Sequence, residues 1–215
     1  MKPLSFIVFF AVPVLCTNVW AGPAFGLKGG VNLANATVHP SERLSYNIKP
    51  GFLVGPAAEI SLSKSNETAM RWEILYAQKG CKISGGRFFG HDEEVLVSAN
   101  ELALALFLVL RFPPRAMTPF LQMGPELGIS LSAEWTEEIP DLDFSKTEKI
   151  EDWRSTNSSV NLGAGVAIRS GKGEVVIDAR YNLGLSNMNT SDEDINFKTN
   201  GIQFLLGYNF TVPSR

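Results

Sequence analysis

The side chains best suited to chemistry in this sequence are charged groups that recur at alternate positions of several short apolar segments. Six are basic and six are acidic. They are Lys28, Glu59, Arg71, Glu73, Lys79, Glu101, Arg111, Glu126, Arg169, Glu174, Asp178 and Arg180. A buried charge is costly unless an opposite charge and further hydrogen bonds accompany it. Equal numbers of the two signs therefore predict an interior network of ion pairs.

Residues of the kind that carry catalysis or bind cofactors are sparse and badly spaced. His39 and His91 lie in different segments, and neither belongs to an HExxH or Ser-His-Asp arrangement. Gly163-Ala164-Gly165 begins like a dinucleotide fingerprint, but Ile168 stands where the third glycine belongs. We expect no enzyme, no cofactor and no metal site. Ser, His and Asp in the connecting segments leave open a membrane-embedded enzyme that works through its loops.

The elements that carry the charges have the period of β-strands. The longest apolar run after residue 21 is 102–110, which lies between Glu101 and Arg111. Nine residues fit a membrane-spanning strand, whereas a spanning helix needs about 20. Its even positions are large and apolar, and both flanking charges fall in the odd register. This alternation predicts a strand with one apolar and one polar face.

The same alternation occurs in eight segments of the chain. They are 25–33, 51–62, 70–79, 101–112, 121–131, 160–169, 174–183 and 202–210. The connections between them alternate in length, the long ones being 34–48, 83–98, 133–157 and 186–198. Short turns on one side and long loops on the other are typical of outer-membrane barrels. We therefore predict an all-β fold, an eight-stranded antiparallel transmembrane barrel.

The predicted barrel has charges inside and apolar side chains outside. No charge falls in the outward register of the eight segments. Because the interior of an eight-stranded barrel is just wide enough for side chains to fill, paired charges predict a filled lumen. A soluble barrel would need the reverse arrangement, since an exterior of Leu, Ile, Val and Phe in water would aggregate.

The N-terminus has the features of a cleavable secretory signal. Lys2 supplies a basic start, residues 6–16 are apolar, and Val19-Trp20-Ala21 places compact residues at a cleavage site. We predict a signal peptide at 1–21 and a barrel domain at 22–215. Only Cys81 then remains, so no internal disulfide can form, and we interpret it as a small buried apolar residue.

Charge elsewhere is concentrated in the long connections. The chain has a formal net charge of −3, which argues against a nucleic-acid partner, and the four long connections together carry −9. Residues 133–157 carry −5 of this through Glu134, Glu137, Glu138, Asp141, Asp143, Glu148, Glu151 and Asp152. These acids could bridge divalent cations to lipopolysaccharide or capture a cationic extracellular partner. Acidic loops that serve only solubility are the alternative.

Several segments resemble the "outer membrane protein beta-barrel domain" family, the PorT-like barrels of Bacteroidetes and relatives. The resemblance rests on FGLKGGVNLA at 25–34, KPGFLVG at 49–55, EILYAQKG at 73–80, GAGV at 163–166 and ARYNLGL at 179–185. It implies an eight-stranded barrel in the bacterial outer membrane, in contact with its lipid and lipopolysaccharide. It implies no single activity.

Three functions fit this expectation. The first is a structural or surface-interaction role through the acidic loops. The second is a PorT-like component of a secretion apparatus, and the third is a narrow pore.

Overall fold

The structure is a computed structural model that describes residues 23–39, 45–88, 91–112, 116–139, 144–150, 153–188 and 196–211. The expected signal peptide at 1–21 lies outside the described residues. The strands are β1 (Ala24–His39), β2 (Ser45–Asn47), β3 (Lys49–Ser61), β4 (Thr68–Phe88), β5 (His91–Arg111), β6 (Met117–Ile139), β7 (Phe144–Lys149), β8 (Thr156–Ser170), β9 (Gly173–Gly184) and β10 (Asn196–Thr211).

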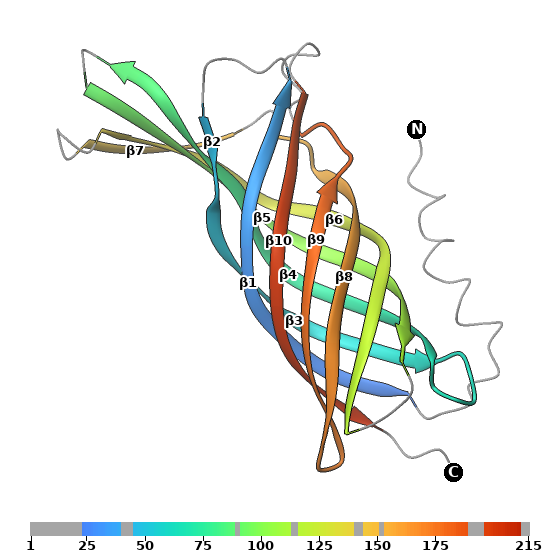
Figure 1. The fold of residues 1–215 in the computed structure, drawn as a ribbon. Coiled ribbons are helices and arrows are strands. Elements are labelled where there is room, and N and C mark those ends of the chain that lie inside the picture. Colours follow the sequence, from blue (N-terminus) through green and yellow to red (C-terminus); the bar gives the residue numbers. More distant parts are fainter. Residues whose placement is uncertain are drawn as a thin grey trace.

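Eight of these strands close into a barrel (Figure 1). Going round the ring, β1 pairs with β3, and β4, β5, β6, β8, β9 and β10 follow before the ring returns to β1. Every one of these pairings is antiparallel. The prediction of a closed eight-stranded antiparallel barrel is confirmed. None of the described residues forms a helix long and apolar enough to cross a membrane.

Strand β5 shows how the sequence sets the two faces of the wall. Its odd positions point inward, and Ala103, Ala105, Phe107 and Val109 are buried there. Its even positions point outward, and Leu108 is 41% exposed. Small alanines inside and leucines outside suit a narrow lumen and apolar surroundings.

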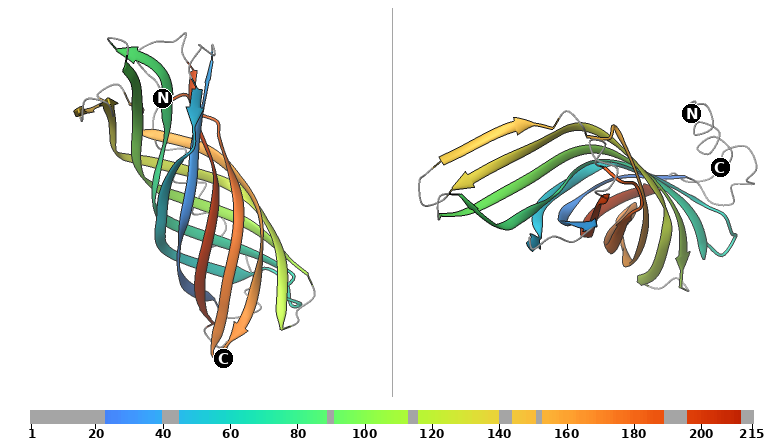
Figure 2. Two further views of the ribbon diagram at one scale, coloured as in Figure 1. Left: turned by 60° about the vertical axis from the view of Figure 1, so that its left-hand side comes forward. Right: turned by 90° about the horizontal axis from the view of Figure 1, so that it is seen from above.

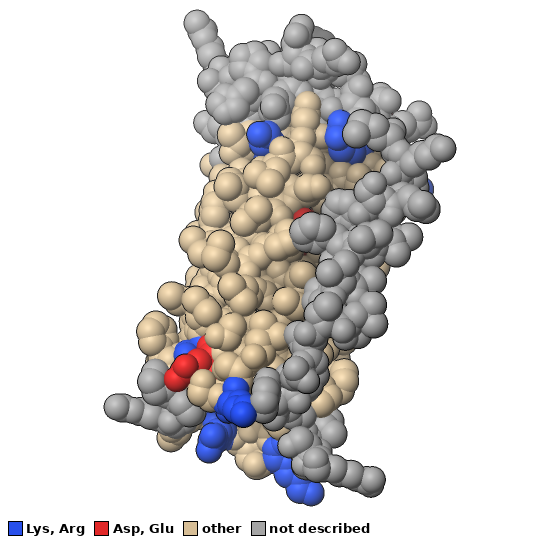
Figure 3. Space-filling view, turned by 90° about the vertical axis from the view of Figure 1, so that its right-hand side faces the viewer, with Lys and Arg blue, Asp and Glu red and all other residues tan. Residues whose placement is uncertain are grey.

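The outward register of the other strands adds a broad apolar belt. Its exposed members include Leu27, Val31, Phe52, Val54, Ile74, Leu121, Met123, Leu162, Ile177, Tyr181, Ile202, Phe204 and Leu206. On the face seen in Figure 3, the visible Lys and Arg side chains gather toward the two ends, and the band between them is almost free of charge. An exposed apolar surface of this extent fits contact with lipid rather than water.

Glycines let neighbouring strands approach closely on the inner face. A Cβ atom at Gly124 would lie 1.8 Å from the carbonyl oxygen of Leu106, and one at Gly30 would lie 1.9 Å from that of Phe204. A larger residue at either position would have to displace the backbone of the adjacent strand.

Strands β4, β5 and β6 continue well past the barrel wall, and β7 pairs with the extended part of β6, which corrects part of the sequence analysis. The expected loop at 83–98 consists mostly of the ends of β4 and β5, and β6 and β7 occupy much of 133–157. Likewise β1 and β2 enter 34–48, and β10 begins inside 186–198. The alternation test missed these extensions because their apolar residues do not keep to one register, as in Val95-Leu96-Val97 of β5.

The extensions form one sheet in the order β2, β4, β5, β6 and β7. We call this the flared sheet. Figure 2 shows that it leaves the barrel at one end and spreads to one side of it.

Candidate functional site

Most of the twelve charged residues predicted for the interior are buried in the lumen. The ten buried ones are Lys28, Glu59, Arg71, Glu73, Lys79, Glu101, Arg111, Glu126, Asp178 and Arg180. Glu174 is partly buried. Arg169 departs from the prediction, since it is exposed. It is the last residue but one of β8, beside the turn at 171–172, so its inward register opens to solvent.

The first of three ion-pair clusters lies near the short turns. Arg111 Nη2 is 2.5 Å from Glu59 Oε1, and Arg111 Nη1 is 3.0 Å from Glu174 Oε2. Arg71 Nη2 is 2.7 Å from the other oxygen of Glu59, and Arg71 Nη1 donates a hydrogen bond to Gln122 Oε1 at 2.8 Å. Two arginines and two glutamates therefore balance one another across β3, β4, β5 and β9.

The second cluster lies in the middle of the barrel. Lys28 Nζ is 2.6 Å from Glu73 Oε1 and 2.6 Å from Asp178 Oδ2. Arg180 Nη1 is 2.6 Å from Glu73 Oε2, and Arg180 Nε donates to Gln203 at 2.6 Å. All four charged side chains are fully buried or nearly so. Their charges cancel, which offsets the cost of removing them from water.

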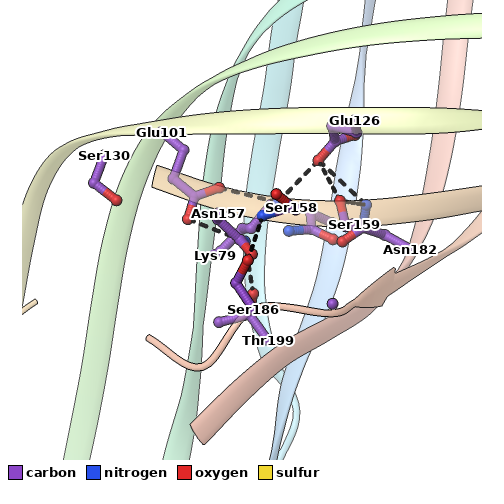
Figure 4. A network of polar contacts seen from close by, with 12 residues as sticks. Lys79, Glu101, Glu126, Ser130, Asn157, Ser158, Ser159, Asn182, Ser186 and Thr199 are labelled. Atoms are coloured by element: carbon purple, nitrogen blue, oxygen red, sulfur yellow. Dashed lines mark hydrogen bonds and ion pairs between the residues drawn. The ribbon is translucent and has the colours of Figure 1, made fainter. Parts of the chain in front are cut away.

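The third cluster lies toward the flared sheet and carries more acid than base (Figure 4). Lys79 Nζ is 2.9 Å from Glu126 Oε1 and 3.0 Å from Glu101 Oε2. Neutral side chains supply the remaining donors, since Asn161 Nδ2 lies 2.9 Å from Glu126 Oε2 and Asn157 Nδ2 lies 3.4 Å from Glu101 Oε1. Amide donors thus replace the second cation that the two carboxylates lack.

The amides in these clusters were not among the residues predicted from the sequence. They are Gln122, Asn157, Asn161, Asn182 and Gln203, and all are buried. Asn161 and Asn182 fall in the inward register of segments that were predicted as strands. That register was the available signal, but a neutral amide does not stand out from its neighbours as a charge does.

An apolar cluster closes the lumen at the end where the flared sheet begins. Ala36, Cys81 and Val97 are buried there, with Ile83, Ile150, Trp153 and Phe197 packed against them. The rings of Trp153 and Phe197 meet edge to face at 5.6 Å. Cys81 is a free, fully buried cysteine. The contacts join β1, β4, β5 and β10 to Ile150 and Trp153, which lie between β7 and β8.

The lumen as a whole is therefore a packed interior rather than an open channel. Ion pairs, amides and apolar side chains fill it from the short turns to the flared sheet. Among the described residues, no group of three or more His, Cys, Asp or Glu is placed to hold a metal ion.

The model of one protein family, described as "Outer membrane protein beta-barrel domain", matches residues 21–189. The chain belongs to this family. It is therefore an outer-membrane barrel, and the family and location expected from the sequence are confirmed. The match is to the family as a whole and does not single out its PorT-like members. No curated protein matches the chain significantly.

Solved structures of similar fold include other outer-membrane barrels. OprG from Pseudomonas aeruginosa aligns with a TM-score of 0.50 and 9% identity, covering 90% of this chain and 98% of OprG. Neisserial surface protein A aligns with a TM-score of 0.47 and 12% identity over 88% of this chain and 99% of that one. Ail of Yersinia pestis, solved with the heparin analogue sucrose octasulfate, aligns with a TM-score of 0.40 and 12% identity, covering 88% of this chain and 99% of Ail. At these identities the likeness concerns the fold alone.

Proposed function

We propose that this outer-membrane barrel is a non-enzymatic surface protein that binds an extracellular partner through its flared sheet and the acidic segment 133–157. In this proposal residues 1–21 are a cleaved signal peptide and residues 22–215 form the barrel. The observation that carries it is the length of β4, β5 and β6, which extend far beyond the apolar belt. A barrel that only spanned lipid would need strands of about 9–11 residues.

The orientation follows from the turns. Ala24 at the start of β1 pairs with Thr211 at the end of β10, so both described ends lie at the short-turn end of the barrel. Outer-membrane barrels place short turns in the periplasm and longer segments outside the cell. This supports an extracellular position for the flared sheet.

The charge of the flared sheet favours a cationic partner. Glu148 is exposed, and Glu134 and Glu137 are half-exposed. Asp141, Asp143, Glu151 and Asp152 belong to the same predicted acidic set but lie outside the described residues. Charges at the rim of an interface mainly steer the encounter, so binding should weaken as salt is added.

We assign the interior charge network a structural role within this function. Its clusters tie together strands that are not neighbours in the ring and fill the space a pore would need. The filled lumen argues against the narrow pore. The short turns offer little periplasmic surface, which argues against the PorT-like secretion component.

Site-specific photo-crosslinking in intact cells tests the proposal. A crosslinker at Ser145, exposed on β7, should trap a partner, whereas one at Ser65, exposed in a short turn, should not. The partner should have a basic surface, and trapping should fall as salt rises.

Trapping at Ser65 alone would favour the secretion component. Loss of binding with a divalent-cation chelator but not with salt would favour bridging to lipopolysaccharide.

A further inference from the structure

Strand β7 is an open edge of the flared sheet. It pairs with β6 from Glu134↔Lys149 to Ile139↔Phe144, and within the part of the chain that the structure describes nothing pairs with its other side. The side chains of residues 145–149 are all exposed. An open edge presents unpaired backbone N–H and C=O groups that another strand can join.

The charges on this edge are arranged so that β7 complements itself. Lys146 and Glu148 lie two residues apart on one face of the strand, with Lys146 Nζ 2.6 Å from Glu148 Oε1. The hydrogen bond between them raises the pKa of Lys146 and lowers the pKa of Glu148, so both remain charged. In an antiparallel pair centred on Thr147, Lys146 of each strand faces Glu148 of the other. Opposite charges directly across a strand pair are stabilising.

Other registers lose this match. A slip of one residue leaves Lys146 opposite either Thr147 or Lys149. A slip of two residues places Lys146 opposite itself or Glu148 opposite itself. Like charges facing each other are destabilising, so the charges select one register. A lysine alone on an edge strand discourages pairing with another strand. With Glu148 two residues away, pairing is disfavoured only in registers that bring like charges together.

The position of the flared sheet fits the symmetry that such a pair requires. Two barrels in one membrane point the same way, so a two-fold axis relating them must run along the membrane normal. The two-fold axis of an antiparallel strand pair is perpendicular to its sheet. Seen from above, β5, β6 and β7 spread out side by side with their broad faces toward the viewer (Figure 2). In the view of Figure 1, β7 is seen nearly edge-on.

We propose that two copies of this chain associate in the outer membrane by antiparallel pairing of their β7 strands about Thr147. The interface is isologous, because each copy contributes the same surface. The pairing joins the two flared sheets into one continuous sheet above the membrane. Lys146 and Glu148 already neutralise each other within one strand, so the new pairs set register and partner more than strength. This inference does not depend on the partner proposed above, and a crosslink from Ser145 to a second copy of the chain would support the β7 pairing rather than that partner.

Cysteine crosslinking of the full-length protein in native outer membranes tests the register. Each T147C residue would face its own copy, so this variant should form a disulfide-linked dimer. The matched control is S145C, exposed on the same face of β7, whose copies would lie about 13 Å apart, too far for a disulfide. We expect about tenfold more dimer from T147C. Equal crosslinking of the two variants, or none from T147C in barrels shown to be folded, would overturn the proposal.

Charge exchange provides the second arm. In the T147C background, K146E places acids opposite acids and E148K places bases opposite bases, so each alone should lose most of the dimer. The double variant K146E/E148K restores opposite charges and should regain it. The K146E and E148K chains expressed together, distinguished by an affinity tag on one of them, should crosslink to each other. Unchanged dimer yield in both single variants would refute charge-selected pairing.

Discussion

Lys28 on β1 and Glu73 on β4 meet across the lumen, with Lys28 Nζ 2.6 Å from Glu73 Oε1. The two strands are not neighbours, because β3 lies between them in the ring. The same ammonium group reaches Asp178 on β9, so one side chain connects three separate parts of the wall. The barrel is therefore held by bonds through its interior as well as by the ladder of backbone hydrogen bonds around it.

Removing this cation should be strongly destabilising. Lys28→Met leaves Asp178 and one oxygen of Glu73 without their shared partner, and breaking a buried pair in this way costs about 3–5 kcal/mol. The free energy of unfolding, measured by urea titration of barrels folded into lipid vesicles, checks the value. Adding Asp178→Asn to Lys28→Met should recover part of the loss. A double variant whose cost equals the sum of the two single costs would show that the groups do not interact.

The two arginines at the short-turn end provide a matched comparison. Arg111→Leu leaves Glu59 and Glu174 each short of a partner and should cost about 3–5 kcal/mol. Arg169→Leu makes the same chemical change at an exposed position and should alter stability by no more than about 0.5 kcal/mol. The same titration measures both variants. Equal costs would mean that the interior charges are not paired as described.

The lipid-facing register can be probed at two depths. Leu106→Arg puts a charge near the middle of the outward face of β5 and should cost about 2–4 kcal/mol in a bilayer. Leu131→Arg, between Ser130 and Ser132 toward the flared-sheet end of the barrel, should cost about 0–1 kcal/mol. Folding free energies in vesicles test the pair. If Leu131→Arg lowered the folding free energy as much as Leu106→Arg, Leu131 would lie as deep in the lipid as Leu106, which would contradict the assigned position of the apolar belt.

The filled lumen makes a prediction about conductance. Purified barrels reconstituted into a planar bilayer should show no steady, reproducible single-channel step, because the three charge clusters and the apolar cluster occupy the passage. A uniform step seen in independent preparations would restore the narrow pore as the function.

The sequence predicted the barrel well wherever one face of a strand meets lipid. In β5 the leucines at even positions and the charges at Glu101 and Arg111 are enough to predict both the strand and its register. Where the strands leave the membrane that signal ends, since residues that face each other there, such as Thr136 and Thr147, are polar. The flared sheet was therefore expected as loops.

The sequence predicted which interior residues point inward. It did not predict how far each residue lies from the end of the barrel, nor which uncharged residues take part. Arg169 shares the inward register of Asn161, yet only Asn161 is buried, because the register does not tell how close a residue lies to the barrel end. The contact between Trp153 and Phe197 joins residues far apart in sequence and outside the alternating segments. Only the folded chain brings them together.

The central claim is that the exposed apolar belt faces lipid while the paired charges face the barrel axis. The most direct test transfers the folded chain without residues 1–21 from detergent into plain buffer and follows it by sedimentation and circular dichroism. We predict that it aggregates or loses its monomeric state, since the belt cannot be solvated by water. A folded, stable monomer in buffer alone would contradict the account.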